Sequence, residues 1–295
     1  MNLLRKFVPN YDLVRSYCQY LNRFQDLKSK RRNTAFILSD LRRCCHILDK
    51  GLNCIPFEKG HGKKFYEQAI QYDSQIKILN DERILKDPAF KWCEEIIRKY
   101  EKAQKGKCSF EKTNFSHYTE SEQEILKSFL ESRISCRNFM KEKIPKYVWE
   151  RMISLSQTAP NSCCRQTTRI YVISDDEKIS SVVPLLGGAT CFGKGIPHLV
   201  CFTSTLYSYE SVDNLLPYMD AGIFMGTFVM AAHVYNVSTT ILNYEHAHAK
   251  YDGKVRKILN IPIDEQIIGF CAVGYPEILP IKPERLDSKL ITNYL

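Results

Sequence analysis

The stretch TAPNSCCRQTTRIYVIS (158–174) joins a helical pattern to a strand through a compact polar turn. Pro160 ends the preceding helix, because proline has no N–H for the helical hydrogen-bond ladder. Asn161 and Ser162 favour a turn, since their side chains bond to the nearby backbone. The segment RIYVIS (169–174) alternates enough to predict a strand. We expect a turn of this kind to present polar groups to the edge of a planar ligand.

Helical and strand patterns alternate on both sides of this turn, from residue 113 to the C-terminus. Helices are predicted over 119–133, 144–159, 219–237 and 251–262, and strands over 169–174, 198–205, 238–244 and 267–276. The first helix opens with a capping box, because Glu122 follows Thr119 by three positions. This order of elements predicts an α+β or α/β domain over residues 113–295.

Residues 1–112 have a different pattern, which is mostly helical. Helices are predicted over 14–27, 34–48, 65–79 and 88–104. Few large apolar residues occur in 101–116, which is typical of a linker and puts the domain limit at 112/113. The N-terminal part carries 24 Lys and Arg against 14 Asp and Glu, whereas the remainder carries 18 against 19. We interpret this excess as a solvated basic surface; an anionic partner is the alternative, and no nucleic-acid-binding motif supports it.

The composition predicts a soluble, cytoplasmic protein. No apolar run reaches the roughly 18–20 residues of a membrane span, and the N-terminus has no signal-peptide core. The twelve cysteines include no C-x-x-C, which favours reduced thiols over disulfides or zinc. The pair HAH (246–248) has no third ligand at metal-binding spacing, so we expect no metal site. A P-loop, a G-x-S-x-G and a G-x-G-x-x-G are all absent from the sequence.

Basic residues suited to anion binding occur in two places in the C-terminal part. Arg133, Ser135 and Arg137 alternate in SRISCRNF (132–139), so an extended backbone would put them on one face. Two guanidiniums and a hydroxyl on one face can bind an anion. Lys282 and Arg285 follow a GYP turn and would add two cations from the far end of the chain.

In their order along the chain, these stretches resemble the flavin-dependent nitroreductase family. That family shows R-x-S-x-R, then A-P-S-x-x-N-x-Q before a strand, then G-Y-P followed by an arginine. The matching residues are Arg133, Ser135, Arg137; Ala159, Pro160, Gln166; Gly274, Tyr275, Pro276; and Arg285. The resemblance implies a nitroreductase-like α+β fold, with a central mixed or antiparallel sheet flanked by helices, after an all-helical N-terminal domain.

The resemblance also implies a cofactor, a partner and a reaction. Family members bind FMN between the two subunits of a homodimer, and NAD(P)H passes a hydride to the flavin before a small-molecule acceptor takes the electrons. Arg133 and Ser135 would hold the FMN phosphate, with Arg285 and Lys282 beside them. Arg137 would face the pyrimidine edge and stabilise the anionic reduced flavin.

Other implied contacts lie around the flavin ring. Leu242 and Asn243 would offer backbone groups to the ring face. Residues of the opening turn would line the ring and the ribityl chain, namely Pro160, Asn161, Ser162, Cys164 and Gln166.

The sequence departs from the family pattern within and beyond this turn. The family asparagine falls at Cys164, which has no amide, and the usual serine falls at Asn161. Thr167 and Thr168 stand where Pro-Trp is common, and 236–238 reads NVS in place of G-L-G. We expect inert thiols at Cys163 and Cys164; a redox-active thiol is the alternative.

The stretches HILDKGL (46–52), GHG (60–62), GGATCFGKG (187–195) and YMDAGIF (218–224) resemble a subgroup associated with polysaccharide biosynthesis. We therefore expect an FMN-dependent oxidoreductase with an unidentified acceptor, in a polysaccharide-related pathway. Two alternatives stay open: a non-catalytic binding protein with a degenerate flavin site, and a flavoprotein with other chemistry, such as dehalogenation or flavin destruction.

Three histidines and one asparagine carry structural predictions. His233 is expected to be a hydrogen-bonded core residue, and His198 a structural one. His46, beside Asp49, is expected to cap a helix or join the two domains, with a substrate-facing role as the alternative. Asn236 is expected in the left-handed conformation that often ends a helix.

Overall fold

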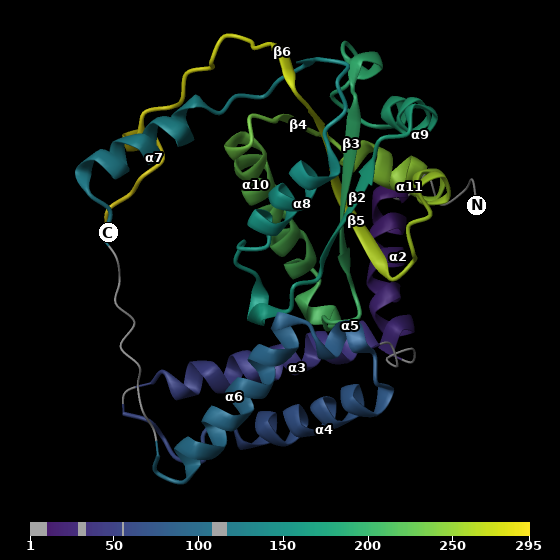
Figure 1. The fold of residues 1–295 in the computed structure, drawn as a ribbon. Coiled ribbons are helices and arrows are strands. Elements are labelled where there is room, and N and C mark those ends of the chain that lie inside the picture. The colour runs from purple at the N-terminus through teal and green to yellow at the C-terminus, as the bar shows by residue number, and fades with distance from the viewer. Residues whose placement is uncertain (1–10, 29–33, 55, 108–116) are drawn as a thin grey trace.

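The computed structural model describes residues 11–28, 34–54, 56–107 and 117–295 (Figure 1). The side chains of residues 12, 25, 26, 28 and 246–249 are outside this description, and the HAH pair (246–248) with them. The expected domain limit at 112/113 also lies outside the described residues. Among the helices described, none is long and apolar enough to cross a membrane.

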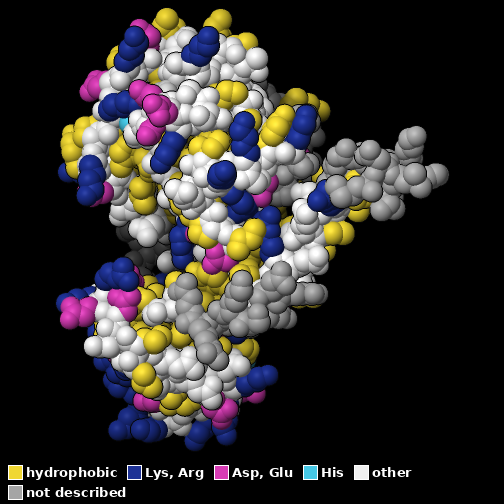
Figure 2. Space-filling view, turned by 90° about the vertical axis from the view of Figure 1, so that its right-hand side faces the viewer, with side chains coloured by type: hydrophobic (Ala, Val, Ile, Leu, Met, Phe, Trp, Pro, Cys, Tyr) yellow, Lys and Arg dark blue, Asp and Glu magenta, His cyan; other side chains and the backbone are white. Residues whose placement is uncertain are grey.

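Three long helices form a helical domain at one end of the molecule (Figure 1). They are α3 (Thr34–Leu52), α4 (Lys63–Leu79) and α6 (Pro88–Gln104), with the single turn α5 (Glu82–Leu85) before α6. Their apolar faces share one core that includes Leu41, Ile76 and Cys93. Figure 2 shows Lys and Arg side chains spread over the outside of this domain, in keeping with the basic surface expected from the sequence.

Helix α2 (Tyr11–Lys28) packs against the C-terminal domain. Its Tyr20 and Phe24 are buried in one cluster with Leu206 and Tyr209. Arg23 adds a hydrogen bond from Nη1 to Gln266 Oε1 at 3.0 Å. The amphipathic face of α2 therefore covers the sheet domain, although it precedes the helical domain in sequence.

The C-terminal domain is α+β, as predicted. Its helices are α7 (Glu120–Ser132), α8 (Lys146–Ser156), α9 (Asp176–Val182), α10 (Leu216–Val234) and α11 (Glu245–Leu259). Its strands are β1 (Asn138–Phe139), β2 (Thr168–Ile173), β3 (His198–Thr205), β4 (Ser238–Leu242), β5 (Glu265–Gly274) and β6 (Pro276–Ile278). Short 3₁₀ turns are η1 (Ser162–Cys164), η2 (Val183–Leu185), η3 (Gly193–Gly195), η4 (Ser211–Asp213) and η5 (Ser288–Leu290). The main sheet has the order β2-β3-β5-β4 with every pair antiparallel, and β1 pairs with β6.

Helices cover both faces of the main sheet, α8 and α10 on one side and α9 and α11 on the other (Figure 1). Side chains of β3 alternate between the two cores: Leu199 and Cys201 pack toward α9 and α11, whereas Val200 and Phe202 pack toward α8 and α10. Because neither face meets water, β3 is an unbroken buried run, as the apolar stretch 198–205 predicts.

Helix α7 and residues 279–295 extend to one side of the sheet domain (Figure 1). The predicted capping box is present, because Glu122 N–H donates to Thr119 Oγ1 and Thr119 N–H donates to Glu122 Oε2 at 2.7 Å. No residue of α7 is buried, and every residue of 279–295 is exposed.

Candidate functional site

The segment Arg133–Arg137 runs beside the start of the edge strand β4. Ser135 and Thr239 form a parallel bridge, and Cys136 N–H donates to Thr239 O at 3.2 Å. Cys136 is fully buried. Because side chains alternate along an extended backbone, Arg133, Ser135 and Arg137 point away from the core on the opposite side.

The two arginines of this segment have no acidic side chain beside them in the described structure. No ion pair among the described residues includes Arg133 or Arg137. Arg133 is half-buried and Arg137 is exposed. Burial and the nearby Arg133 guanidinium lower the pKa of His233. The segment therefore presents a positive surface that an anion can approach.

Leu242 and Asn243 lie at the other end of β4. Leu242 is buried, and Asn243 forms two backbone hydrogen bonds with Gly187, at 2.8 and 3.1 Å. Asn243 Oδ1 accepts from Glu245 N–H at 2.8 Å. Both backbone groups of Asn243 are thus paired already, so a ligand here would meet its side-chain amide nitrogen first.

Lys282 and Arg285 lie in the exposed C-terminal segment. Among the described residues, no hydrogen bond or ion pair joins either of them to Arg133, Ser135 or Arg137. Their expected role at the phosphate stays a prediction.

The turn that opens the C-terminal domain's first long strand has an unusual backbone. Cys163, Cys164 and Gln166 all have positive φ, at 51°, 57° and 53°. The left-handed region disfavours a residue with a Cβ by about 1–2 kcal/mol, so the surroundings must hold this conformation. Asn161 Oδ1 accepts from Gln166 N–H at 2.9 Å, which is the side-chain turn expected of Asn161.

Helix α3 of the helical domain holds this turn. Arg42 Nε donates to Cys164 O at 2.8 Å, and Arg42 Nη2 donates to Cys164 Sγ at 3.2 Å. Ser39 Oγ donates to Arg165 O at 3.1 Å. Ser39 and Arg42 are both buried. Cys164, where the resemblance to the family leads us to expect an asparagine, therefore has its carbonyl and sulfur bonded to the helical domain.

A buried acid on α10 fixes the other side of the turn. Asp220 Oδ1 accepts from Ser162 N–H at 2.9 Å and from Ser162 Oγ at 2.8 Å. Asp220 Oδ2 accepts from Tyr209 Oη at 2.6 Å, and burial raises the pKa of Tyr209. Asp220 was not among the predicted site residues, although a lone acidic residue in an otherwise apolar helix favours a buried, hydrogen-bonded role.

The two halves of the expected flavin site lie at opposite ends of α10. The turn contacts Asp220 near its start, whereas Ser132, beside Arg133, contacts His233 near its end. Thirteen residues separate these contacts, which is about 20 Å along a helix. One chain therefore does not bring the turn and the Arg133–Arg137 segment together.

A family model matches most of this sheet domain. The nitroreductase family model matches residues 130–190 and 186–275. Residues 130–275 belong to the nitroreductase family. The match starts within α7 and ends in the GYP turn, so it includes the Arg133–Arg137 segment and the turn 158–166 and leaves out the helical domain.

Solved structures show the same fold at low identity. An oxidoreductase of Bacteroides thetaiotaomicron, assigned as NADH dehydrogenase/NAD(P)H nitroreductase, is 17% identical with a TM-score of 0.51, over 57% of this chain and 96% of that one. The hypothetical oxidoreductase YcnD of Bacillus subtilis is 22% identical with a TM-score of 0.50, over 58% and 75%. NfrA2 of B. megaterium is 19% identical with a TM-score of 0.50, over 58% and 73%. No curated protein matches the chain.

Two histidines of the nitroreductase domain have structural roles. His198 is buried; its Nε2 accepts from Ile144 N–H at 2.9 Å and its Nδ1 bonds to Ser174 Oγ at 2.7 Å, which confirms the structural prediction. His233 is hydrogen-bonded, to Ser132 Oγ at 2.8 Å, but it is only half-buried. The expected core position was wrong, because His233 lies near the end of α10 against Ser132 and Phe129 of α7, a helix in which no residue is buried.

Two motifs of the N-terminal part pack against each other. The His61 ring lies on Gly51, where an added Cβ would be 2.6 Å from His61 Cδ2. Gly62 has a φ of 75°, which favours glycine. The glycines of HILDKGL and GHG thus allow a close contact between α3 and the loop before α4. His46 is half-buried on α3, and burial lowers its pKa.

Asn236 adopts the expected left-handed conformation after α10, with a φ of 57°. Val237 N–H then donates to Ala232 O at 3.0 Å, which satisfies a carbonyl at the helix end. Asn236 therefore adopts this backbone conformation at a position where the family commonly has glycine.

Proposed function

We propose that this nitroreductase-family protein is an FMN-dependent oxidoreductase that passes electrons from NAD(P)H to a small-molecule acceptor. The observation that carries this proposal is the Arg133–Arg137 segment, whose two guanidiniums lie on either side of Ser135 and have no acidic partner within the described part of the chain. The Ser135 hydroxyl has no hydrogen-bond partner among the described residues. Guanidinium and hydroxyl donors on one face fit a phosphate monoester, which FMN carries.

When bound, FMN would supply the hydride and electron chemistry, and the protein would position it and adjust its charge. Arg133 and Ser135 would bind the phosphate beside the start of β4. Arg137 would stabilise negative charge that develops on the ring. Asn243 directly follows β4 and lies four residues beyond Thr239, about 13 Å along an extended chain, where its side-chain amide could donate to the ring.

We further propose a homodimer, because one chain separates the two halves of the site by the length of α10. Among the described residues, α10 has an uncovered stripe formed by Met219, Gly222, Ile223 and Gly226. These positions recur at helical spacing, and the two glycines leave room for a second helix to approach closely. A two-fold partner packed on this stripe would place its turn 158–166 near the Arg133–Arg137 segment.

Helix α7 and the C-terminal segment also favour a second copy. Ile125 and Leu130 of α7 are 69% and 60% exposed, and Ile281 and Leu290 are 95% and 73% exposed. A helix of 13 residues is marginally stable in water without a packed apolar face. A partner subunit that covers these side chains would explain why α7 and residues 279–295 expose apolar residues in the single chain. It would also bring Lys282 and Arg285 into the dimer, where they could contact the FMN phosphate.

The polysaccharide-related pathway rests on sequence motifs, and the cytoplasmic location rests on composition. The polysaccharide-related pathway and the cytoplasmic location stay predictions. The non-catalytic alternative has one specific test at Cys164. If the site is a degenerate one, Cys164→Asn should raise FMN affinity sharply, whereas a working site with Arg42 bonded to Cys164 should lose affinity in that variant.

The phosphate contact is tested by the double variant Arg133→Ala/Arg285→Ala. We expect the purified variant to lose bound FMN, measured by visible absorption and by the flavin released on denaturation. The double variant Arg98→Ala/Arg151→Ala removes the same charge from exposed positions of α6 and α8 and should keep its flavin. Equal flavin content in the two double variants would mean that the phosphate is bound elsewhere.

A further inference from the structure

A cavity of about 280 Å³ lies between the helical domain and the nitroreductase domain. Its helical-domain side includes Ala35 and Arg42 of α3 and Ile84 of α5. Its other side includes Pro160 and Asn161 of the turn, which are two of the residues expected to line the flavin. A ligand in this cavity would therefore contact both domains and lie next to the expected flavin site.

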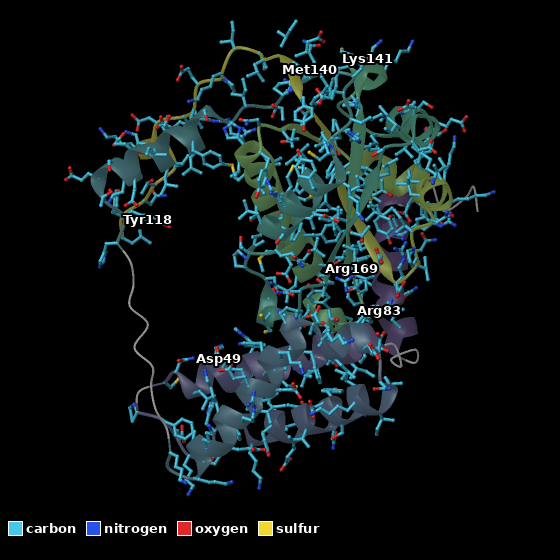
Figure 3. All side chains as sticks on the ribbon, viewed as in Figure 1. Asp49, Arg83, Tyr118, Met140, Lys141 and Arg169 are labelled. Atoms are coloured by element: carbon cyan, nitrogen blue, oxygen red, sulfur yellow. The ribbon has the colours of Figure 1, made fainter. Side chains whose placement is uncertain are left out.

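Three arginines line the cavity. Arg42 and Arg165 are only 5% and 9% exposed, and Arg169 is half-buried. Figure 3 shows Arg169 at the end of β2 that faces the helical domain, close to α5 with its labelled Arg83. The hydrogen bonds of Arg169 are to backbone oxygens of Gln166 and Thr168, both at 3.0 Å. Neither Arg42 nor Arg169 forms an ion pair with a described residue.

The two carboxylates in the lining already have partners. Asp220 is bonded to Ser162 and Tyr209, and Asp87 caps α6 by accepting from Ala89 N–H at 2.7 Å. Neither carboxylate forms an ion pair with Arg42 or Arg169, and the three arginines of the lining exceed its two carboxylates by one formal positive charge.

Arg165 adds a donor without a partner. Its Nη2 lies 3.6 Å from Asp213 Oδ2, and its guanidinium lies over the Tyr209 ring. Its Nε is buried and has no hydrogen-bond partner among the described residues. A buried N–H group is rarely left unsatisfied, so a bound anion or a water molecule is expected beside it.

The remaining lining is apolar. Ala35, Leu38 and Ile84 from the helical domain face Pro160 and Phe224 from the nitroreductase domain. An inorganic ion would leave this part of the lining in contact with water only. The lining therefore matches a molecule that has an apolar body and one anionic group.

We propose that this interdomain cavity binds a small organic anion, with its carboxylate or phosphate at Arg42, Arg165 and Arg169 and its apolar body against Leu38, Ile84 and Phe224. This inference rests on the proposed function, in which the anion is the electron acceptor. NAD(P)H supplies two electrons and one proton as hydride, and the acceptor takes these together with a second proton from water. The helical domain then serves to recognise the acceptor.

The test is isothermal titration of the purified full-length protein with benzoate, phenyl phosphate and neutral benzamide. We expect benzoate or phenyl phosphate to bind at least tenfold more tightly than benzamide, and the tighter of the two identifies the anionic group. Arg169→Gln should weaken that binding by roughly 10- to 100-fold, the range for loss of a charge-assisted hydrogen bond. Arg151→Gln, an exposed arginine on α8, should bind as the unmodified protein does.

Three outcomes would overturn the proposal: no binding of either anion, equal binding of benzamide, or unchanged binding by Arg169→Gln. Displacement of the bound anion by added FMN would also overturn it, because the cavity would then belong to the flavin. Visible absorption of the same samples reports flavin separately. Anion binding by a protein that takes no flavin refutes the proposed function, and the acceptor role with it, but leaves the anion site in place. A flavoprotein without anion binding refutes this inference alone.

Discussion

Replacing Arg42 by methionine should release the turn at 161–166. The substitution removes the hydrogen bonds from Nε to Cys164 O at 2.8 Å and from Nη2 to Cys164 Sγ at 3.2 Å. Methionine keeps an apolar chain next to the Trp92 ring, over which the guanidinium lies. A hydrogen bond from a charged donor contributes about 1.5–3 kcal/mol. We therefore expect the free energy of opening the turn to fall by about 2 kcal/mol, which is roughly 30-fold in the opening equilibrium.

Hydrogen–deuterium exchange of the peptide 158–168 measures this opening. Cys164 N–H and Arg165 N–H donate to Asn161 O and Ser162 O within the turn, so their protection reports whether it is closed. Arg98→Met is the matched control, because Arg98 is an exposed arginine of the same helical domain. If the peptide exchanges at the same rate in the Arg42 and Arg98 variants, the helical domain does not hold the turn.

The remaining predictions concern stability and are checked by urea unfolding. Burial lowers the pKa of His198 from 6.5 to about 4, so the folded protein holds the imidazole neutral. The contribution of this neutral imidazole to the free energy of unfolding is complete above pH 6.5, and about 3 kcal/mol should be lost as the pH falls from 6.5 to 4. His198→Gln should reduce this loss. Gly274→Ala should destabilise the protein by about 1–3 kcal/mol, because the added Cβ would lie 2.5 Å from Pro197 Cγ. An unchanged urea midpoint would show that the backbone at the GYP turn moves to make room for the methyl group. Arg256 is buried, and its Nε lies 2.7 Å from Asp252 Oδ2. Asp252→Asn leaves this guanidinium without its counter-charge and should reduce the free energy of unfolding by about 3–5 kcal/mol. A loss below about 1 kcal/mol would contradict this expectation.

Elements with a long, regular pattern could be predicted from the sequence. The capping box of Thr119 and Glu122 marks the start of α7, and the apolar run 198–205 marks a strand covered on both faces. Short elements were missed, because a pattern needs length to be recognised. The turn α5 has only four residues, and β1 and β6 have two and three, so their positions depend on tertiary contacts.

Some features of the candidate site could likewise be predicted from a local sequence pattern, and others could not. The R-x-S-x-R pattern predicts an anion-binding face, and the structure places Ser135 against β4, where such a face is open to a ligand. The contact from Arg42 to Cys164 spans 122 positions, and no local pattern encodes it. Asp220 was missed for a similar reason, because its partners Ser162 and Tyr209 come from other segments. The distance between the turn 158–166 and the Arg133–Arg137 segment also depends on the position of α10, which the hydrophobic periodicity of the sequence does not predict.

The measurement that tests the central claim most directly is the visible absorption spectrum of the purified protein with added FMN, recorded anaerobically before and after NAD(P)H. The account predicts stoichiometric bound flavin whose absorption bleaches when NAD(P)H is added. A colourless protein that does not retain FMN would contradict the account and leave the non-catalytic alternative.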